Sequence, residues 1–132
     1  MNYNTILESL YLFCEGKEIP KVMQIWADTE VDMCETNLKD QHTTFCGIYD
    51  NTLDMSLYSG PCPPIGETWC PHLIEEALKK FSCGDVDYGT FVGEIMKAGA
   101  CRYTIEPKRG KACFSNEKGL KIVLYISDSF KV

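Results

Sequence analysis

Apolar residues recur every three or four positions along four segments of the chain, which is the spacing of one buried helix face. The first predicted helix follows Asn4 and stops at Gly16, and the second has Pro20 in its first turn. Two further helices are predicted over residues 71–84 and 87–99, each ending near a glycine. The pattern therefore predicts four short amphipathic helices in two pairs.

Six other segments have the alternating or β-branched composition of strands, with turn residues between them. Three such segments follow each pair of helices, so the predicted order is ααβββ, a connector, then ααβββ. They read VDMCETN, TTFCGIYD and TLDMSLY in the first half and CRYTIEP, KACFSN and LKIVLYIS in the second. Because strands joined by short turns pair antiparallel, the sequence predicts an α+β fold with helices packed on one face of an antiparallel sheet.

A stretch rich in proline and glycine, residues 59–71, separates two halves that cover about 1–58 and 72–132. The halves align at a shift of about 68 residues, which places Leu10 on Leu78. We hypothesise a duplication that produced two pseudo-symmetric repeats around one core. The alternative stays open, because any two ααβββ segments align to this extent by pattern alone.

Length and charge restrict the class of protein and the class of partner. A chain of this length has room for one core, so we predict a single domain over residues 1–132. The formal net charge of −6 opposes contact with a nucleic-acid backbone. No apolar run approaches the ~20 residues that span a membrane. The N-terminal segment lacks the basic start of a secretory signal, so we expect a cytoplasmic protein without a nucleic-acid or membrane partner.

Eight cysteines are spread irregularly along the chain, and no Cys-x-x-Cys pair occurs. In a reducing compartment a free cysteine behaves as a small apolar side chain. We therefore predict that the cysteines within helix or strand patterns are core or sheet residues, namely Cys14, Cys34, Cys46, Cys101 and Cys113.

The second half resembles the small bacterial and prophage YdfO/YbcV-like family, which is sometimes labelled "phage envelope protein". The shared pattern is a glycine and a helix cap, an aromatic pair, a helix ending in Ala-Gly, and aromatic residues on the following hairpin. Those places are held here by Gly84, Asp87, Tyr88, Phe91, Ala98, Gly99, Tyr103, Phe114 and Gly119. The first half agrees through EGKEIPKVMQIWADTEVDMCE. The resemblance implies an α+β domain of unknown function and implies no cofactor or catalytic residue.

The stretch PCPPIGETWCPH raises the question of a metal site, because it holds two cysteines and a histidine. Structural zinc takes four Cys or His ligands, often as pairs two to four residues apart. Cys62, Cys70 and His72 lack that spacing, and the fourth candidate, Cys83, lies beyond a helix. We therefore predict a stiff connector with a turn at Gly66, and expect no metal and no other cofactor. A structural zinc protein stays an alternative.

A cysteine nucleophile activated by histidine is the second chemical alternative. His42 and Cys46 share one face of a predicted strand, but four residues of strand separate them by about 13 Å. Cys46 or Cys101 could instead meet His72 in a pocket between the two halves, although the sequence shows no group that would orient the histidine. This arrangement would suit a small-molecule-binding protein or a cysteine-dependent enzyme.

The long apolar segment LKIVLYIS near the C-terminus carries the main functional expectation. At a sheet edge, such a strand would need cover by a second copy or by a partner protein. In the centre of the sheet, the apolar run would instead mark a strand with both faces covered. We therefore expect a non-enzymatic domain of prophage or accessory origin that binds a protein or itself. Under this expectation no residue has a catalytic role.

Overall fold

The computed structural model describes residues 1–126 and confirms the α+β prediction. Each half of the chain contributes two helices followed by three strands. A single turn of 3-10 helix, η1, lies between the first two strands of the second half. The elements are α1 (Tyr3–Cys14), α2 (Ile19–Asp28), β1 (Val31–Asn37), β2 (His42–Gly47), β3 (Thr52–Ser56), α3 (Pro71–Ser82), α4 (Tyr88–Lys97), β4 (Arg102–Glu106), η1 (Pro107–Arg109), β5 (Lys111–Ser115) and β6 (Lys121–Tyr125).

The first helix begins two residues earlier than the sequence predicted. The side chain of Asn2, not that of Asn4, accepts a hydrogen bond from the backbone N–H of Thr5 at 3.1 Å. An N-cap side chain satisfies one of the backbone donors that a helix start leaves free. Asp87 caps α4 in the same way through the N–H of Thr90 at 2.9 Å.

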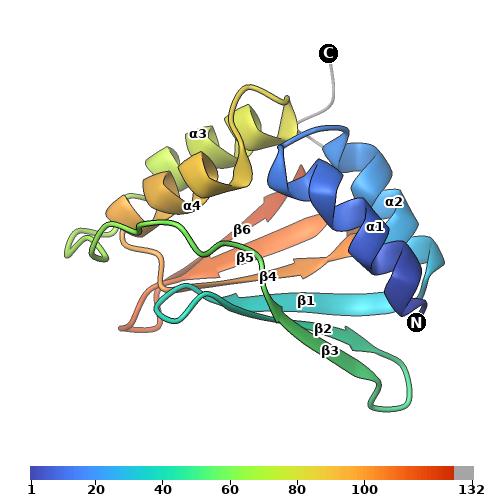
Figure 1. Ribbon diagram of the computed structural model, residues 1–132. Helices are drawn as coiled ribbons and strands as arrows, with labels where there is room; N and C mark the ends of the chain where they lie inside the picture. The colour runs from blue at the N-terminus through green and yellow to red at the C-terminus, as the bar shows by residue number, and fades with distance from the viewer. Residues whose placement is uncertain (127–132) are drawn as a thin grey trace.

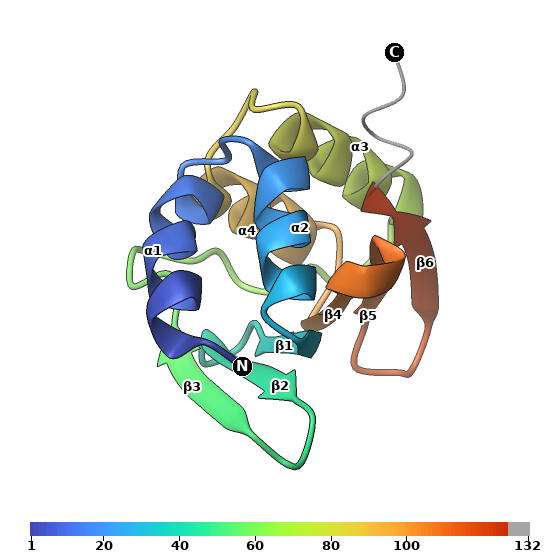
Figure 2. The same ribbon diagram turned by 90° about the vertical axis from the view of Figure 1, so that its right-hand side faces the viewer.

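The six strands form one antiparallel sheet in the order β3-β2-β1-β4-β5-β6. All four helices lie on the same side of this sheet in both views (Figures 1 and 2). The first strand of each half is central, so β1 pairs with β4 where the halves meet. The last strand of each half is an edge. None of the described helices is long and apolar enough to cross a membrane.

The two halves repeat each other with a constant offset in their strand ladders. Asn37 of β1 faces His42 of β2. Sixty-nine residues later, Glu106 of β4 faces Lys111 of β5. The ladders between β2 and β3 and between β5 and β6 repeat with the same offset of 69. The ladders thus show a geometric repeat at 69 rather than about 68, while its origin by duplication stays a hypothesis.

Aromatic side chains join the two halves into one core between the helices and the sheet. Phe13 of α1 lies 4.9 Å from Trp26 and 5.2 Å from Phe81, measured between ring centroids. It also lies 5.3 Å from Tyr88 of the second half. Such pairs contribute stability beyond the burial of their area. The space between the helices of the two halves is therefore filled by rings.

The connector PCPPIGETWCPH packs against the C-terminal end of α4. The N–H of Gly66 donates to the carbonyl of Met96 at 2.8 Å, and the N–H of Cys70 donates to that of Ala98 at 2.9 Å. A Cβ at Gly66 would overlap the carbonyl oxygen of Lys97. Close approach of two backbones, rather than the turn geometry that the sequence suggested, explains the glycine.

Candidate functional site

The sheet face that the helices leave uncovered, called here the open face, carries mostly polar side chains at alternate strand positions. One row of directly paired residues crosses all six strands. It consists of Ser56, His42, Asn37, Arg102, Ser115 and Lys121. Antiparallel sheets tolerate a solvated face of this kind. Three of the six side chains in this row are basic.

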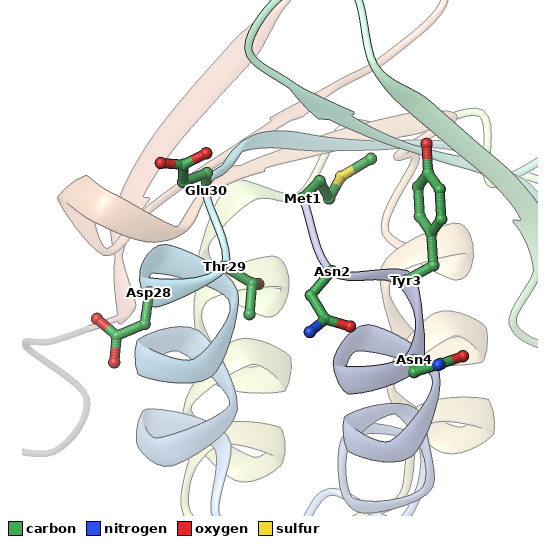
Figure 3. Close-up of a pocket in the computed structure, with 7 residues that line it drawn as sticks. All are labelled: Met1, Asn2, Tyr3, Asn4, Asp28, Thr29 and Glu30. Atoms are coloured by element: carbon green, nitrogen blue, oxygen red, sulfur yellow. The ribbon is translucent and has the colours of Figure 1, made fainter.

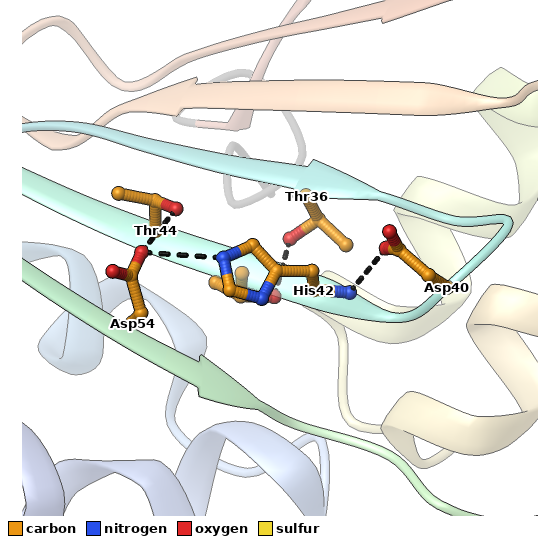
Figure 4. Close-up of polar contacts among 6 residues, drawn as sticks. Thr36, Asp40, His42, Thr44 and Asp54 are labelled. Carbon is orange, nitrogen blue, oxygen red and sulfur yellow. Dashed lines mark hydrogen bonds and ion pairs between the residues drawn. The ribbon is translucent and has the colours of Figure 1, made fainter.

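His42 contacts an aspartate on this face rather than a cysteine. Its Nε2 lies 3.3 Å from Oδ1 of Asp54, which also accepts a hydrogen bond from the hydroxyl of Thr44 at 2.6 Å (Figure 4). The bond from Thr44, followed by the attraction of His42, holds the pKa of Asp54 below its usual value. His42 and Asp54, on β2 and β3, are exposed and Thr44 is half-buried, and an exposed ion pair contributes little to stability.

Cys46 lies on the same face in surroundings that disfavour a reactive thiolate. Burial raises the pKa of its thiol, and the carboxylates of Glu35, Asp54 and Asp32 raise it further. A nucleophilic cysteine needs the opposite, a lowered pKa from positive neighbours.

The structure does not bring the catalytic candidates together. Cys46 faces Met33 of β1, whereas the carbonyl of Cys101 accepts a hydrogen bond from the N–H of Leu38, at 2.9 Å. Five residues of strand β1 therefore separate the two cysteines by roughly 16 Å. His72 is exposed at the start of α3 in the helix layer, on the other side of the sheet from Cys46 (Figure 1).

The metal candidates are also dispersed. Cys70 is the N-cap residue of α3, and Cys83 follows its last residue, so a helix of 12 residues separates them by roughly 20 Å. Cys62 is exposed and lies 3.6 Å, through its Sγ, from Nε2 of Gln41. Among residues 1–126, no group of three or more His, Cys, Asp and Glu side chains is arranged to hold a metal ion.

A wide hollow lies where the start of α1 meets the end of α2 (Figure 3). Its volume is about 670 Å³. Asn2 and Thr29 point into the gap, whereas the carboxylates of Asp28 and Glu30 point away from it. The lining thus offers hydrogen-bonding groups without convergent charge, and it contains no cysteine or histidine.

A second cavity, of about 470 Å³, lies where the end of β1 meets β4 and the turn between β5 and β6. It is called here the Cys101 cavity. Its wall includes the thiol-bearing residue Cys101 and three basic residues, Lys39, Arg102 and Lys121, while Glu117 is the one acidic residue that lines it. His72 does not line it. Residues of both halves of the chain line the cavity, which lies at one end of the sheet.

Sequence reasoning identified Cys101 but missed the basic side chains around it. Lys39, Arg102 and Lys121 come from three distant segments. Arg102 and Lys121 share a row only because Ser115 pairs with both. No local motif signals such a cluster, since it depends on which strands become neighbours.

Strand β6 forms an edge of the sheet, which decides between the edge and central positions that the apolar segment near the C-terminus left open. The N–H of Asn116 donates to the carbonyl of Leu120, and that of Ile126 donates to the carbonyl of Gly110. Antiparallel ladders alternate between bonded and non-bonded pairs, so Ile122 and Leu124 bond to β5. The backbone groups of the other three residues, Lys121, Val123 and Tyr125, then point outward.

The side chains of these three residues lie on the open face and are exposed. Val123 is 45% exposed and Tyr125 is 48% exposed. The opposite edge, β3, differs in chemistry at the equivalent positions, which hold Thr52, Asp54 and Ser56. A charged residue in the middle of an edge strand discourages pairing with another strand. In β6 the middle position is the apolar Val123, and the charged residue, Lys121, lies at the end of the strand.

Comparison with known proteins identifies the family of this chain and does not identify an activity. No curated protein matches it. A family model described as "Protein of unknown function (DUF1398)" matches residues 14–119. This range runs from the last residue of α1 to the turn before β6. The chain therefore belongs to the DUF1398 family, whose function is unknown.

Proposed function

We propose that this protein is a non-enzymatic, self-associating domain that pairs with a second copy through strand β6. The observation that carries the proposal is the open edge of β6, with outward backbone groups at Lys121, Val123 and Tyr125. Within residues 1–126 these N–H and C=O groups have no strand partner, and such groups beside exposed apolar side chains are a template for strand addition. The partner is a second copy because the strand complements itself.

Self-complementarity is greatest in the antiparallel register that centres on Val123. Val123 then faces Val123 of the second copy, and Lys121 faces Tyr125. This register pairs every residue of β6 and places no like charges opposite each other. A register centred on Lys121 would oppose two ammonium groups and pair fewer residues. A twofold axis through Val123 would extend the sheet and keep both open faces on one side.

The resemblance to the YdfO/YbcV-like family supports a prophage or accessory origin, and a cytoplasmic location is part of the same proposal. In that setting the domain acts by assembly and not by chemistry. The raised pKa of the Cys46 thiol and the dispersal of His72, Cys46 and Cys101 support the non-enzymatic assignment.

Sedimentation of the full chain over a range from micromolar to millimolar concentration tests the proposal, together with amide exchange. We expect a monomer–dimer equilibrium. In the dimer, the amides of Lys121, Val123 and Tyr125 become protected, whereas those of Ile122 and Leu124 are protected at all concentrations. A chain that stays monomeric at millimolar concentration, with the three outward amides exchanging freely, would overturn the proposal.

Val123→Asp is the decisive variant because it would oppose two carboxylates at the centre of the interface. It also gives β6 the residue that β3 already has at the equivalent position, Asp54. We expect dimerisation to weaken by at least about tenfold. Thr52→Asp, on the β3 edge, is the matched control and should leave the dimer unchanged. Equal loss in both variants would contradict pairing through β6.

A further inference from the structure

The Cys101 cavity gathers positive charge in a chain that is negative overall. Three of its lining residues, Lys39, Arg102 and Lys121, are basic, against one acidic residue, Glu117. The whole chain has a net charge of −6. A concave site with an excess of one sign of charge, on a protein whose net charge has the other sign, concentrates ligands that are attracted to that excess.

From this arrangement we propose that the Cys101 cavity binds a small organic carboxylate. The volume of about 470 Å³ falls within the range of small-molecule sites. Polar groups from Asn37, Ser115 and Asn116 line the rest of the wall. The cavity therefore suits a polar anion better than an apolar ligand.

Two of the basic side chains already contact carboxylates of the protein, so their positions accommodate this kind of anion, and a ligand would join or replace those contacts. Lys39 forms an ion pair with the carboxylate of Glu117. Arg102 contacts the carboxylate of Glu35 through its Nε, at 3.5 Å. The guanidinium presents a planar fork that matches a carboxylate, so its terminal nitrogens can serve a ligand while Nε keeps its contact. Lys121, from the edge strand, adds the third positive charge.

The alkylation rates of two half-buried cysteines can probe the local charge, because one cysteine lines the cavity and the other lies outside it. Cys101 lines the cavity beside Lys39 and Arg102. Cys46 lies among the carboxylates of Glu35 and Asp54. Iodoacetate and iodoacetamide transfer similar groups to a thiolate, with release of iodide, but only iodoacetate is a carboxylate. The ratio of their rates at each thiol therefore measures attraction of a carboxylate to that place.

Alkylation of the native full chain, read by peptide mass spectrometry, tests the proposal. We expect the rate ratio of iodoacetate to iodoacetamide to be about tenfold higher at Cys101 than at Cys46 at low ionic strength. Succinate should slow the reaction of iodoacetate at Cys101 but not at Cys46. An equal ratio at the two cysteines, with no protection by succinate, would overturn the proposal.

Substitutions at the start of β4 and in the loop after β1 separate the site from the β6 interface. Lys39→Gln and Arg102→Gln should each lower the ratio at Cys101 by at least about threefold. Lys21→Gln, which removes the same charge from α2, should leave it unchanged. If Cys101 reacts with neither reagent, calorimetry with succinate decides: binding that Lys39→Gln abolishes supports the site, and absence of binding to the unmodified chain overturns it.

Discussion

The hydroxyl oxygens of Tyr88 and Tyr103 lie 2.8 Å apart in the core, one from α4 and the other from β4. Both side chains are buried. Next to them, Thr36 pairs with Tyr103 across β1 and β4, and its hydroxyl lies 2.7 Å from that of Thr43. A buried polar group is stable only when it has a partner, so these hydroxyls fix how the helix layer sits on the sheet.

Removal of one hydroxyl from the tyrosine pair should destabilise the fold by about 1–3 kcal/mol, because the other would be left buried without this partner. We expect this for Tyr88→Phe and for Tyr103→Phe in urea unfolding. The double variant should cost less than the sum of the two, since both phenols are replaced by apolar rings of similar shape. Strictly additive costs would show that the two hydroxyls do not interact.

The same pair should make the protein lose stability at high pH. Burial raises the pKa of Tyr88 and of Tyr103 far above the ordinary value of 10.0. Above pH 10 the unfolded state loses these protons while the folded state keeps them, so the folded state binds more protons. Stability is then fully present below pH 10 and falls as pH rises beyond it.

Urea unfolding between pH 8 and pH 11 measures this loss. The natural chain should lose more stability over the range than the variant with phenylalanine at positions 88 and 103, which lacks both phenols. Equal slopes in the two proteins would contradict the assignment.

Local pattern predicted the elements well because their causes are local. Apolar residues recur at three- and four-residue spacing around Phe13 and around Phe91. This spacing indicates a helix without reference to distant parts of the chain. The beginning of α1 was wrong by two residues because Asn2 and Asn4 are both suitable caps, and only the bond to Thr5 distinguishes them. Alternation in the strands likewise predicted a sheet with one buried face.

The features that the sequence did not predict depend on contacts between segments that are distant along the chain. The sequence suggested a repeat at about 68 residues, and the ladders give the constant offset of 69 and show that the equivalent edges are β3 and β6. The Cys101 cavity depends on the adjacency of β1 and β4, which no spacing along the chain predicts. Gly66 was assigned to a turn because its contact with Lys97 comes from another element.

A hydrogen bond joins Ser9 of α1 to Trp26 of α2, whereas the equivalent residues of the second half are apolar. We expect the stability effects of substitutions at Ser9 and Trp26 to depend strongly on each other. The indole N–H of Trp26 donates to the hydroxyl of Ser9 at 2.8 Å, and that hydroxyl donates to the carbonyl of Ile6. A shift of 68 residues, which places Leu10 on Leu78, also places Ser9 on Ala77, and a shift of 69 places Trp26 on Ile95. Ser9→Ala should cost about 1–3 kcal/mol because it leaves the buried indole N–H without this acceptor.

Urea unfolding of Ser9→Ala, Trp26→Phe and the double variant forms a cycle that isolates the bond. Trp26→Phe should also destabilise, by loss of packing against Phe13 and Phe45. The double variant should be more stable than the sum predicts, by about 1 kcal/mol, because no donor is then left unpaired. A Ser9→Ala cost that persists in full when Trp26 is already phenylalanine would contradict the role of the bond.

Two glycines with similar backbone angles separate the cost of conformation from the cost of contact. Gly16 has φ +69° and Gly119 has φ +87°, and residues with a side chain rarely adopt backbone angles in this region. A Cβ at Gly16 would overlap the carbonyl oxygen of Val86, whereas a Cβ at Gly119 has no atom within 4 Å. Gly119→Ala should therefore cost only the conformational strain, about 1 kcal/mol.

Gly16→Ala should cost several kcal/mol, because the chain after α1 must also move away from the segment between α3 and α4. Urea unfolding of the two variants gives the difference directly, and the shared backbone strain cancels. We expect Gly16→Ala to be less stable than Gly119→Ala by at least about 2 kcal/mol. Similar costs at both positions would mean that the segment at Val86 yields easily, and that the contact between the two halves at this point contributes little to the fold.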